Sequence, residues 1–258
     1  MRVPPPPRSR CVARFGVPLA LFVAWWAATA SGWTKSYQLA SPRDLARELA
    51  DLAQSGLLFR DVGASAERVA LGFAIALLSA VVLGSLVGGS RAAERALDPT
   101  LQAVRSVPSL AWVPLILLWL GIGETAKITL VAIGAFFPIY VALVSGIHGV
   151  DRKLVEVGTM FGLSRFALIA RVLVPATLPQ LLVGARIGLT QAWLFLVAAE
   201  LLAATNGLGF LLTDGQQTSR TDEILVAILL FAACGKLSET AMRALERRLA
   251  GWTDTVPA

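Results

Sequence analysis

Residues that could carry out catalysis or bind a metal are few in this 258-residue chain. The only histidine is His148, and the two cysteines, Cys11 and Cys234, lie far apart with no CxxC or Cys/His cluster. This spacing offers no metal-ligand set and no nucleophile–base pair. The sequence also has no GxxxxGK[ST] phosphate loop, so it lacks the usual ATP cradle. We therefore expect a non-catalytic chain that binds no metal or cofactor itself.

The most informative pattern is a polar segment at 150–180 that lies between two long apolar stretches. It reads Val155-Glu156-Val157-Gly158-Thr159-Met160-Phe161-Gly162, then Val172-Leu173-Val174-Pro175. An acidic residue, small residues, a glycine six positions on and a proline predict two short helices around a turn. We expect Gly162 to form the turn, because glycine adopts positive φ without steric cost, and Pro175 to end the second helix. Such a unit has the form of a docking element.

The elements that hold this segment are predicted to be membrane helices. Hydrophobic residues make up 56% of the chain, against about 45–50% in soluble domains, and they gather in long runs. A membrane span needs about 20 mainly apolar residues, so we expect an all-α integral membrane protein with about six transmembrane helices. The candidate spans are 15–33, 69–89, 101–122, 128–147, 182–204 and 224–242.

Several details of the spans are also predicted. The uncharged run 15–33 is longer than the apolar core of a signal peptide, about 7–15 residues, so we interpret it as a retained first span. Kinks are expected at Pro108 and Pro114 in the third span. Small residues along the second span favour close helix packing. Ser41-Pro42 predicts the start of a short amphipathic helix, with serine as N-cap.

The distribution of charge predicts the orientation. Most of the 23 Lys and Arg residues fall in the two tails and in the loops on one side of the predicted spans. The positive-inside rule then places both termini and the 148–181 loop in the cytoplasm. No basic stripe with interleaved aromatic residues is visible, so we expect no nucleic-acid binding.

The polar segment resembles the signature of the membrane subunits of bacterial binding-protein-dependent ABC importers. That signature is Glu-Ala-Ala, three residues, Gly, nine residues, then Ile-x-Leu-Pro. Glu156, Gly162 and Pro175 hold its defining positions at the right spacings. The chain departs from it at Val157-Gly158, which replaces Ala-Ala, and Gly158 weakens the helix by about 1 kcal/mol relative to alanine.

The resemblance extends over roughly 15–252 and is strongest to the aliphatic sulfonate permeases. Taurine, nitrate and pyrimidine-precursor permeases are similar. The segments that carry it include Ser106–Leu115, Trp119–Glu124, Phe137–Tyr140 and Val150–Arg152. The resemblance implies the type I ABC importer permease fold in the bacterial inner membrane. It also implies a second permease copy (a homodimer), two cytoplasmic ATP-binding subunits that hold ATP and Mg, and an extracytoplasmic solute-binding protein.

Together these inferences give a layout and two sets of site residues. The layout is a cytoplasmic tail at 1–14, a first span at 15–33, an outer loop with the amphipathic helix at 34–68, a permease core at 69–247 and a cytoplasmic tail at 248–258. The expected ATPase-coupling residues are Glu156, Val157, Gly158, Phe161, Gly162, Leu163, Phe166 and Pro175. Candidate pathway or gate residues are Trp112, Thr190, Gln191, Trp193 and Glu200.

Each pathway candidate has a structural alternative. The tryptophans could pack between helices or sit at the membrane interface, and Thr190 and Gln191 could bond between helices. Glu200 is a poor ligand for an anionic solute, so a structural contact near the outer mouth is favoured for it.

Two other protein classes are weighed against the importer permease. An ion-coupled secondary transporter would predict inverted repeats, and none is visible. An intramembrane enzyme would need a reactive pair within the spans. The single histidine lies outside the span centres, and no paired acids lie at mid-span.

Overall fold

The computed structural model describes residues 9–32, 35 and 38–251. These residues form the helices α1 to α11 with short 3₁₀ and π segments, and the described part of the chain contains no strand. The predicted all-α class is therefore confirmed. Two compact units can be distinguished: Met1–Phe59 with Leu211–Leu229, and Arg60–Phe210 with Leu230–Ala258.

The first unit contains α1 (Ser9–Ala30) and α2 (Pro42–Gln54). The start of α2 follows the sequence prediction, with Pro42 in the first turn and Ser41 as N-cap. The Asp44 N–H donates to Ser41 Oγ at 3.2 Å, and the Ser41 N–H donates to Asp44 Oδ2 at 3.4 Å. This capping box satisfies two backbone donors that the helix leaves free. Hydrogen bonding from Ser41 lowers the pKa of the Asp44 carboxyl.

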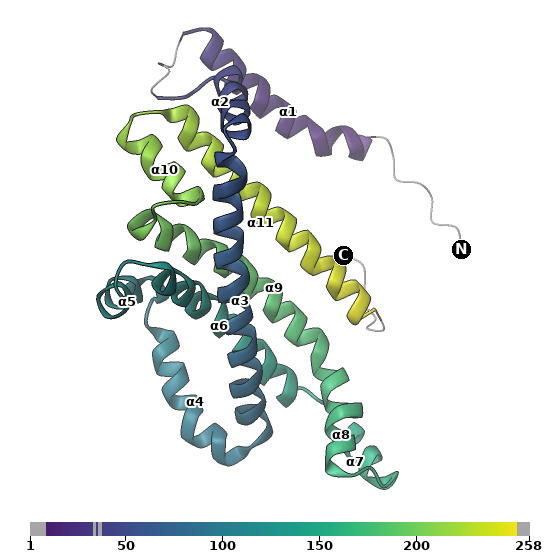
Figure 1. The fold of residues 1–258 in the computed structure, drawn as a ribbon. Helices are drawn as coiled ribbons and strands as arrows, with labels where there is room; N and C mark the ends of the chain where they lie inside the picture. Colours follow the sequence, from purple (N-terminus) through teal and green to yellow (C-terminus); the bar gives the residue numbers. More distant parts are fainter. Residues whose placement is uncertain (1–8, 33–34, 36–37, 252–258) are drawn as a thin grey trace. The chain divides into compact units, whose positions relative to one another are not determined.

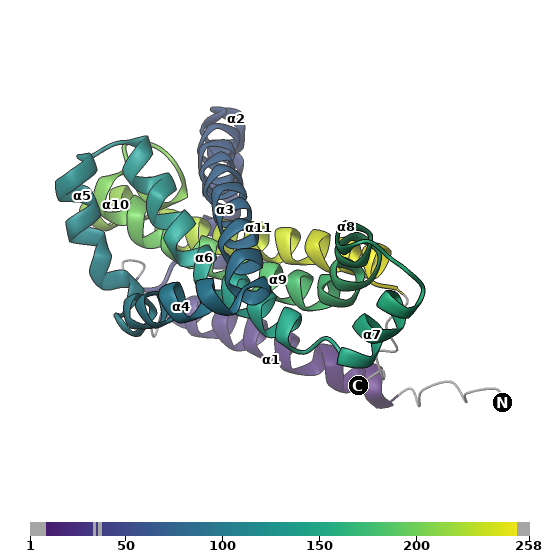
Figure 2. The ribbon, with the colours of Figure 1, turned by 90° about the horizontal axis from the view of Figure 1, so that it is seen from below.

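The second unit is built around α3 (Leu57–Gly89), α6 (Glu124–His148) and α9 (Val174–Ala203). Helices α6 and α9 lie side by side (Figure 2). The unit also contains α4 (Arg91–Ser106), η1 (Ser109–Trp112), α5 (Val113–Leu120), α7 (Arg152–Met160), α8 (Arg165–Leu168) and η2 (Ile169–Leu173), all shown in sequence colours in Figure 1. Helices α10 (Leu208–Gln217) and α11 (Thr221–Leu249) each belong partly to both units.

Glycines bring the core helices into close contact. On α3, a Cβ at Gly72 would lie 2.6 Å from Val131 Cγ1, and one at Gly84 would lie 2.9 Å from Leu143 Cδ2, both on α6. On α9, a Cβ at Gly188 would lie 2.8 Å from Ile139 Cγ1 of α6. Helix backbones can approach this closely only where side chains are small. The close packing predicted for the second span is thus present.

Four helices of the described residues are long and apolar enough to cross a membrane: Leu57–Gly89, Glu124–His148, Ile169–Leu202 and Thr221–Leu249. They contain the second, fourth and sixth predicted spans and nearly all of the fifth. The first predicted span overlaps α1, whose apolar stretch Leu19–Ala30 is shorter than the others. With the bent pair described next, the described residues give up to five spans by length and composition, against the six predicted.

The third predicted span is broken rather than kinked. Helix α4 and the segment Leu110–Leu120 are bent by 82° relative to each other. Val107 at the C-cap of α4 is extended, with φ −73° and ψ 127°, as expected for a residue before proline. Pro108 then stands as the N-cap of η1. The kink predicted at Pro108 is thus a full break, whereas Pro114 lies in the first turn of α5, where proline is tolerated.

The contact at Gly72 generates a stability prediction. Gly72→Ala should lower the free energy of unfolding by about 1–3 kcal/mol, because the new methyl group overpacks against Val131 and the Ile128 carbonyl. The measurement is the thermal unfolding midpoint of the purified protein in detergent. Gly63→Ala on the same helix is the matched control, since nothing lies within 4 Å of its Cβ. It should leave stability unchanged or raise it by about 0.5–1 kcal/mol. Equal loss in both variants would contradict the packing account.

Candidate functional site

The segment predicted to dock a partner is a helical hairpin made of α7, a turn and α8. Asp151 caps α7, its Oδ1 accepting from the Lys153 N–H at 2.9 Å. At the other end Gly162 has φ +71°. The Gly162 N–H donates to Thr159 O at 2.9 Å and the Leu163 N–H donates to Gly158 O at 3.1 Å. This is a Schellman motif, and it confirms the predicted turn at Gly162.

Gly158 allows the hairpin to close. It is buried in α7, and a Cβ at this position would lie 3.2 Å from Leu168 Cδ1, 3.5 Å from Leu163 Cδ1 and 3.6 Å from Val172 Cγ2. Gly158, the second residue of the departure from Ala-Ala, therefore lies where α7 packs on α8 and η2. Glycine lowers the helix propensity of α7 at this position, but the absence of a side chain lets α7 pack closely on α8 and η2.

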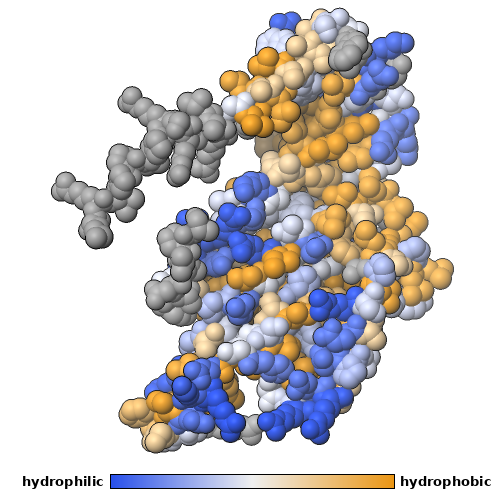
Figure 3. All heavy atoms as spheres, turned by 180° about the vertical axis from the view of Figure 1, so that it is seen from behind, coloured by the Kyte–Doolittle hydropathy of each residue, from blue (hydrophilic) through white to orange (hydrophobic). Residues whose placement is uncertain are grey.

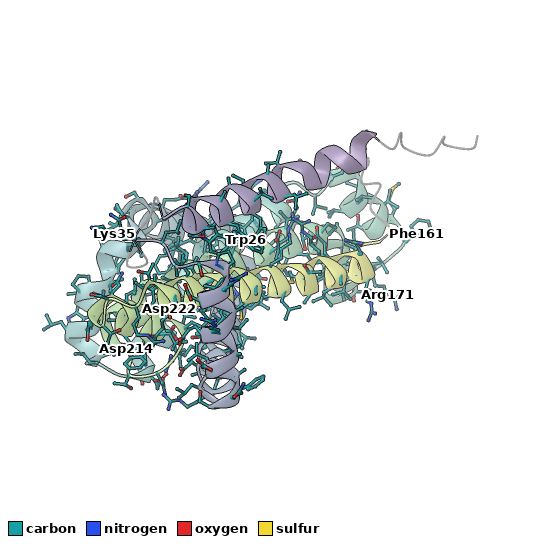
Figure 4. The ribbon with its side chains drawn as sticks, turned by 90° about the horizontal axis from the view of Figure 1, so that it is seen from above. Trp26, Lys35, Phe161, Arg171, Asp214 and Asp222 are labelled. Carbon is teal, nitrogen blue, oxygen red and sulfur yellow. The ribbon has the colours of Figure 1, made fainter. Side chains whose placement is uncertain are left out.

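The tip of the hairpin exposes large apolar side chains among charged ones. Met160 and Phe161 are 86% and 82% exposed, and Val157 is also exposed. Phe161 and Arg171 both project outward (Figure 4), and apolar and polar atoms alternate over this part of the surface (Figure 3). Exposed charges favour an aqueous location, so this tip is better explained by a protein partner than by lipid.

The remaining predicted coupling residues surround the tip. The exposed Glu156 forms an ion pair with Arg152 one turn earlier, at 3.4 Å. A pair this exposed contributes little to stability, so Glu156 is available to other partners. Leu163 is half-buried under the hairpin. Phe166 lies in α8, and its side chain is outside the described part of the structure.

Pro175 does not end a helix, contrary to the sequence prediction. The chain runs from α8 through the π-helical turn η2 into α9, and Pro175 lies in the first turn of α9. Proline lacks the N–H for an i→i−4 bond, and its ring crowds the preceding turn. The wider π turn directly before it accommodates this defect. The hairpin is thus joined to α9 without a flexible connection.

A second group of polar residues is buried where α3, α6 and α9 meet. Arg68 on α3 donates from Nη1 to Glu200 Oε1 of α9 at 2.5 Å. The same guanidinium forms a fork with Glu124 at the start of α6, Nε to Oε2 at 2.6 Å and Nη2 to Oε1 at 2.8 Å. The side chains of Arg68 and Glu200 are 3% and 0% exposed. We call Ser65, Arg68, Glu124, Glu200 and Asn206 the buried ionic cluster, although Glu124 lies at its outer edge with a side chain 57% exposed.

The loop after α9 completes this cluster. Arg68 also donates to the carbonyl and side-chain oxygens of Asn206, and Ser65 Oγ donates to Glu200 Oε1 at 2.8 Å. The Gly209 N–H donates to Glu200 Oε2 at 2.8 Å. Gly207 has φ +107°, and a Cβ there would lie 2.6 Å from both Arg68 Nη1 and Glu200 Oε1. Only glycine fits at this position, so the loop is shaped around the ion pair.

Arg68 and Glu124 were not among the predicted site residues, and Arg68 falls at the end of the predicted outer loop 34–68. The signal was present in the helical period. Asp61, Ser65, Arg68, Gly72 and Ala76 recur at intervals of three or four residues, which places them on one helix face. All five are buried. The structural role favoured for Glu200 agrees with its contacts.

The other pathway candidates are not gathered at one place. Trp112 and the exposed Trp119 line a cavity of about 400 Å³ with side chains of α3, α5 and α6. Trp193 donates from Nε1 to Ser238 Oγ at 2.9 Å and meets Phe231 edge to face. Thr190 is exposed and donates to Arg186 O at 3.2 Å, and Gln191 is half-buried.

Comparison with known proteins places these features in context. The profile of the family described as "Binding-protein-dependent transport system inner membrane component" matches residues 72–251. The chain is 38% identical over 239 residues to the aliphatic sulfonates transport permease protein SsuC of Bacillus subtilis, covering 93% of this chain and 87% of that protein. It is 39% identical to SsuC of Escherichia coli, covering 93% and 92%. It is 34% identical to the taurine transport system permease protein TauC of the same organism, covering 95% and 92%.

A solved structure supports the fold. An inward-facing conformation of the MetNI methionine ABC transporter matches with a TM-score of 0.63 and 21% identity, covering 76% of this chain and 98% of that one.

The buried ionic cluster generates the second prediction. Arg68→Ala should lower the free energy of unfolding by about 3–5 kcal/mol, because it leaves Glu200 charged and unpaired in the interior. Arg95→Ala, which removes an exposed arginine of α4, should change it by less than about 1 kcal/mol. Chemical unfolding of the purified protein in detergent measures both. A small effect at Arg68 would mean that the cluster does not hold the three helices together.

Proposed function

This chain belongs to the family of binding-protein-dependent transport system inner membrane components, as a multi-pass permease of the ABC importer class, and from that premise we propose its substrate, partners and mechanism. It forms the transmembrane pathway for a small anionic solute, of which aliphatic sulfonates are the first candidate. A separate ATP-binding subunit supplies the energy, so ATP and Mg bind that subunit and this chain catalyses no reaction. The working unit contains two copies of the chain, two ATP-binding subunits and an extracytoplasmic solute-binding protein.

The hairpin α7–α8 is the observation that carries the proposal. Its exposed tip, with Phe161 and Met160 among charged residues, fits an apolar cleft on an ATP-binding subunit. Glu156, exposed beside it, can meet basic groups of that subunit. This assignment places the hairpin and both termini on the cytoplasmic side, in agreement with the distribution of Lys and Arg.

Alternating access follows from how the hairpin is attached. Because α8, η2 and α9 are continuous, a displacement of the hairpin must tilt α9. Helix α9 packs closely on α6 through Gly184 and Gly188, so α6 moves with it. At the far end of α9, Glu200 is tied to α3 and α6 by the buried ionic cluster. Closure of the ATP-binding subunits would therefore rock the three helices as one body and open the pathway to the outside.

The choice of solute rests on the relatives. Two proteins described as aliphatic sulfonates permeases are 38% and 39% identical to this chain. A taurine permease at 34% and a nitrate permease at 34% over a shorter stretch keep these anions as alternatives. The exposed Thr190 and the half-buried Gln191 on α9 are the pathway residues we favour, since neutral polar side chains can contact an anion without holding it.

Coupling is tested at the hairpin tip. Phe161→Ser should reduce ATP-dependent solute uptake and co-purification of the ATP-binding subunit by about tenfold or more, as expected for loss of an aromatic anchor. Its unfolding temperature should not change, because the side chain is 82% exposed. The matched control is Phe59→Ser, which removes an aromatic residue 70% exposed near the start of α3. Normal uptake by the Phe161 variant would remove the docking role from the tip.

The solute is tested by growth. A strain that lacks this permease should fail to use aliphatic sulfonates as the sole sulfur source but should grow normally on sulfate. Parallel cultures with taurine as sulfur source and nitrate as nitrogen source separate the alternatives. Reintroducing the wild-type gene should restore growth, whereas the Phe161→Ser gene should restore it poorly. Normal growth of the deletion strain on every sulfonate would exclude that substrate class.

A further inference from the structure

A cavity of about 690 Å³ lies between the beginning of α9 and the end of α11, entirely within the second unit. The second half of α11 runs alongside α9 (Figures 1 and 2), held by the Trp193–Ser238 hydrogen bond. Three arginines from the two helices converge on the cavity, Arg186 from α9 and Arg243 and Arg247 from α11. None of them belongs to the hairpin, to the buried ionic cluster or to the candidate pathway set.

Positive charge exceeds negative charge around this cavity. Among the described residues that line it, Glu246 is the only carboxylate, and it lies 3.7 Å from Arg186 Nε, which is too far for a good hydrogen bond. Arg243 pairs with Glu239 at 2.5 Å. No ion pair with Arg247 occurs in the part of the chain that the structure describes. Each guanidinium carries five N–H donors, so most of these donors remain free for a ligand.

Apolar side chains also line the cavity. They are those of Pro179 and Val183 on α9 and of Ala250 after α11. Arginine forks suit the planar and tetrahedral oxyanions, carboxylate, phosphate and sulfonate, and an apolar wall suits a short carbon chain. We propose that this cavity binds an organic oxyanion, with its sulfonate or phosphate head on Arg186, Arg243 and Arg247 and its carbon chain against Pro179 and Val183.

The location of the cavity suggests what such an anion would do. Gln180, another lining residue, packs on Gly146 near the end of α6, where a Cβ at Gly146 would lie 2.9 Å from Gln180 Cβ. Pro179 and Gln180 lie just after the first turns of α9, which continues from the hairpin. A bound anion would therefore join α11 to α9 beside the segment that moves, and would favour one tilt of α9 over the other.

Two sources can supply this chemistry. One is the transported solute itself after release, which rests on the proposed function. The other is the phosphate of an anionic phospholipid. Both place an oxyanion head on the same arginines, so binding can be measured before the source is known.

The test uses the permease purified with its ATP-binding subunits in neutral detergent and stripped of lipid. Sodium hexanesulfonate is titrated in by calorimetry without ATP. We expect saturable binding that Arg247→Gln weakens on the order of tenfold, as for loss of a charged hydrogen-bond donor. Arg247→Lys should weaken it less, because it keeps the charge and loses the fork. Thermal unfolding without ligand shows that each variant is folded.

The matched control is Arg91→Gln, which removes an exposed arginine of α4 away from the cavity lining. Equal weakening by this control, or unchanged affinity in Arg247→Gln, would overturn the proposal. Repeating the titration in lipid nanodiscs with and without phosphatidylglycerol separates the sources. If phosphatidylglycerol blocks hexanesulfonate, the lipid phosphate is the occupant, and if it does not, the solute is. Uptake driven by ATP is measured separately, so failure of binding leaves the importer assignment standing.

Discussion

The guanidinium of Arg68 is the interaction on which the arrangement of the core depends. It contacts Glu200 on α9, Glu124 at the start of α6 and Asn206 in the loop after α9. A charge at 3% exposure in an apolar bundle is tolerated only when it is fully paired. Three helices and a loop must therefore meet at one point in one register. Wrong registers would leave a charge unpaired in the interior, which disfavours them.

The glycines depend on the same constraint. Arg68 can reach Glu124 and Glu200 because the helices that carry these residues pack closely. Gly72 and Gly84 allow α3 to approach α6, and Gly188 allows α9 to approach α6 at Ile139. Gly207 and Gly209 then leave room for the carboxylate of Glu200. Lipid tails are as apolar as the helix surfaces, so burial of apolar surface does not drive membrane helices together. Close packing and polar contacts therefore decide which helices associate. In this chain the glycines set the distance between helices and the ionic cluster sets their register.

Sequence reasoning predicted the local features of the site better than the long-range ones. The turn at Gly162 and the cap at Ser41 depend on neighbouring residues, and both are present. The predicted helix end at Pro175 was wrong, because the π turn before it accommodates the missing proline N–H. The third span is broken because Val107, which precedes Pro108, is extended and ends α4. The partners of Arg68 lie 56 and 132 positions away along the chain. No local pattern reports such pairs, although the helical period of α3 already placed Arg68 on the buried face.

The two ends of α9 differ in how their charges are balanced, and this difference bears on mechanism. At the Glu200 end Arg68 and Glu200 pair with each other, and their side chains are 3% and 0% exposed. In the first half of α9, Arg186 is loosely paired with Glu246, and it lines a cavity together with Arg243 and Arg247 of α11. A fully paired end resists displacement, because any movement would uncover a charge. An end with unused donors can adopt alternative partners at little cost. In the mechanism that we propose, α3, α6 and α9 rock together about the Glu200 end, and the hairpin end moves furthest, where a partner or an anion can shift its position.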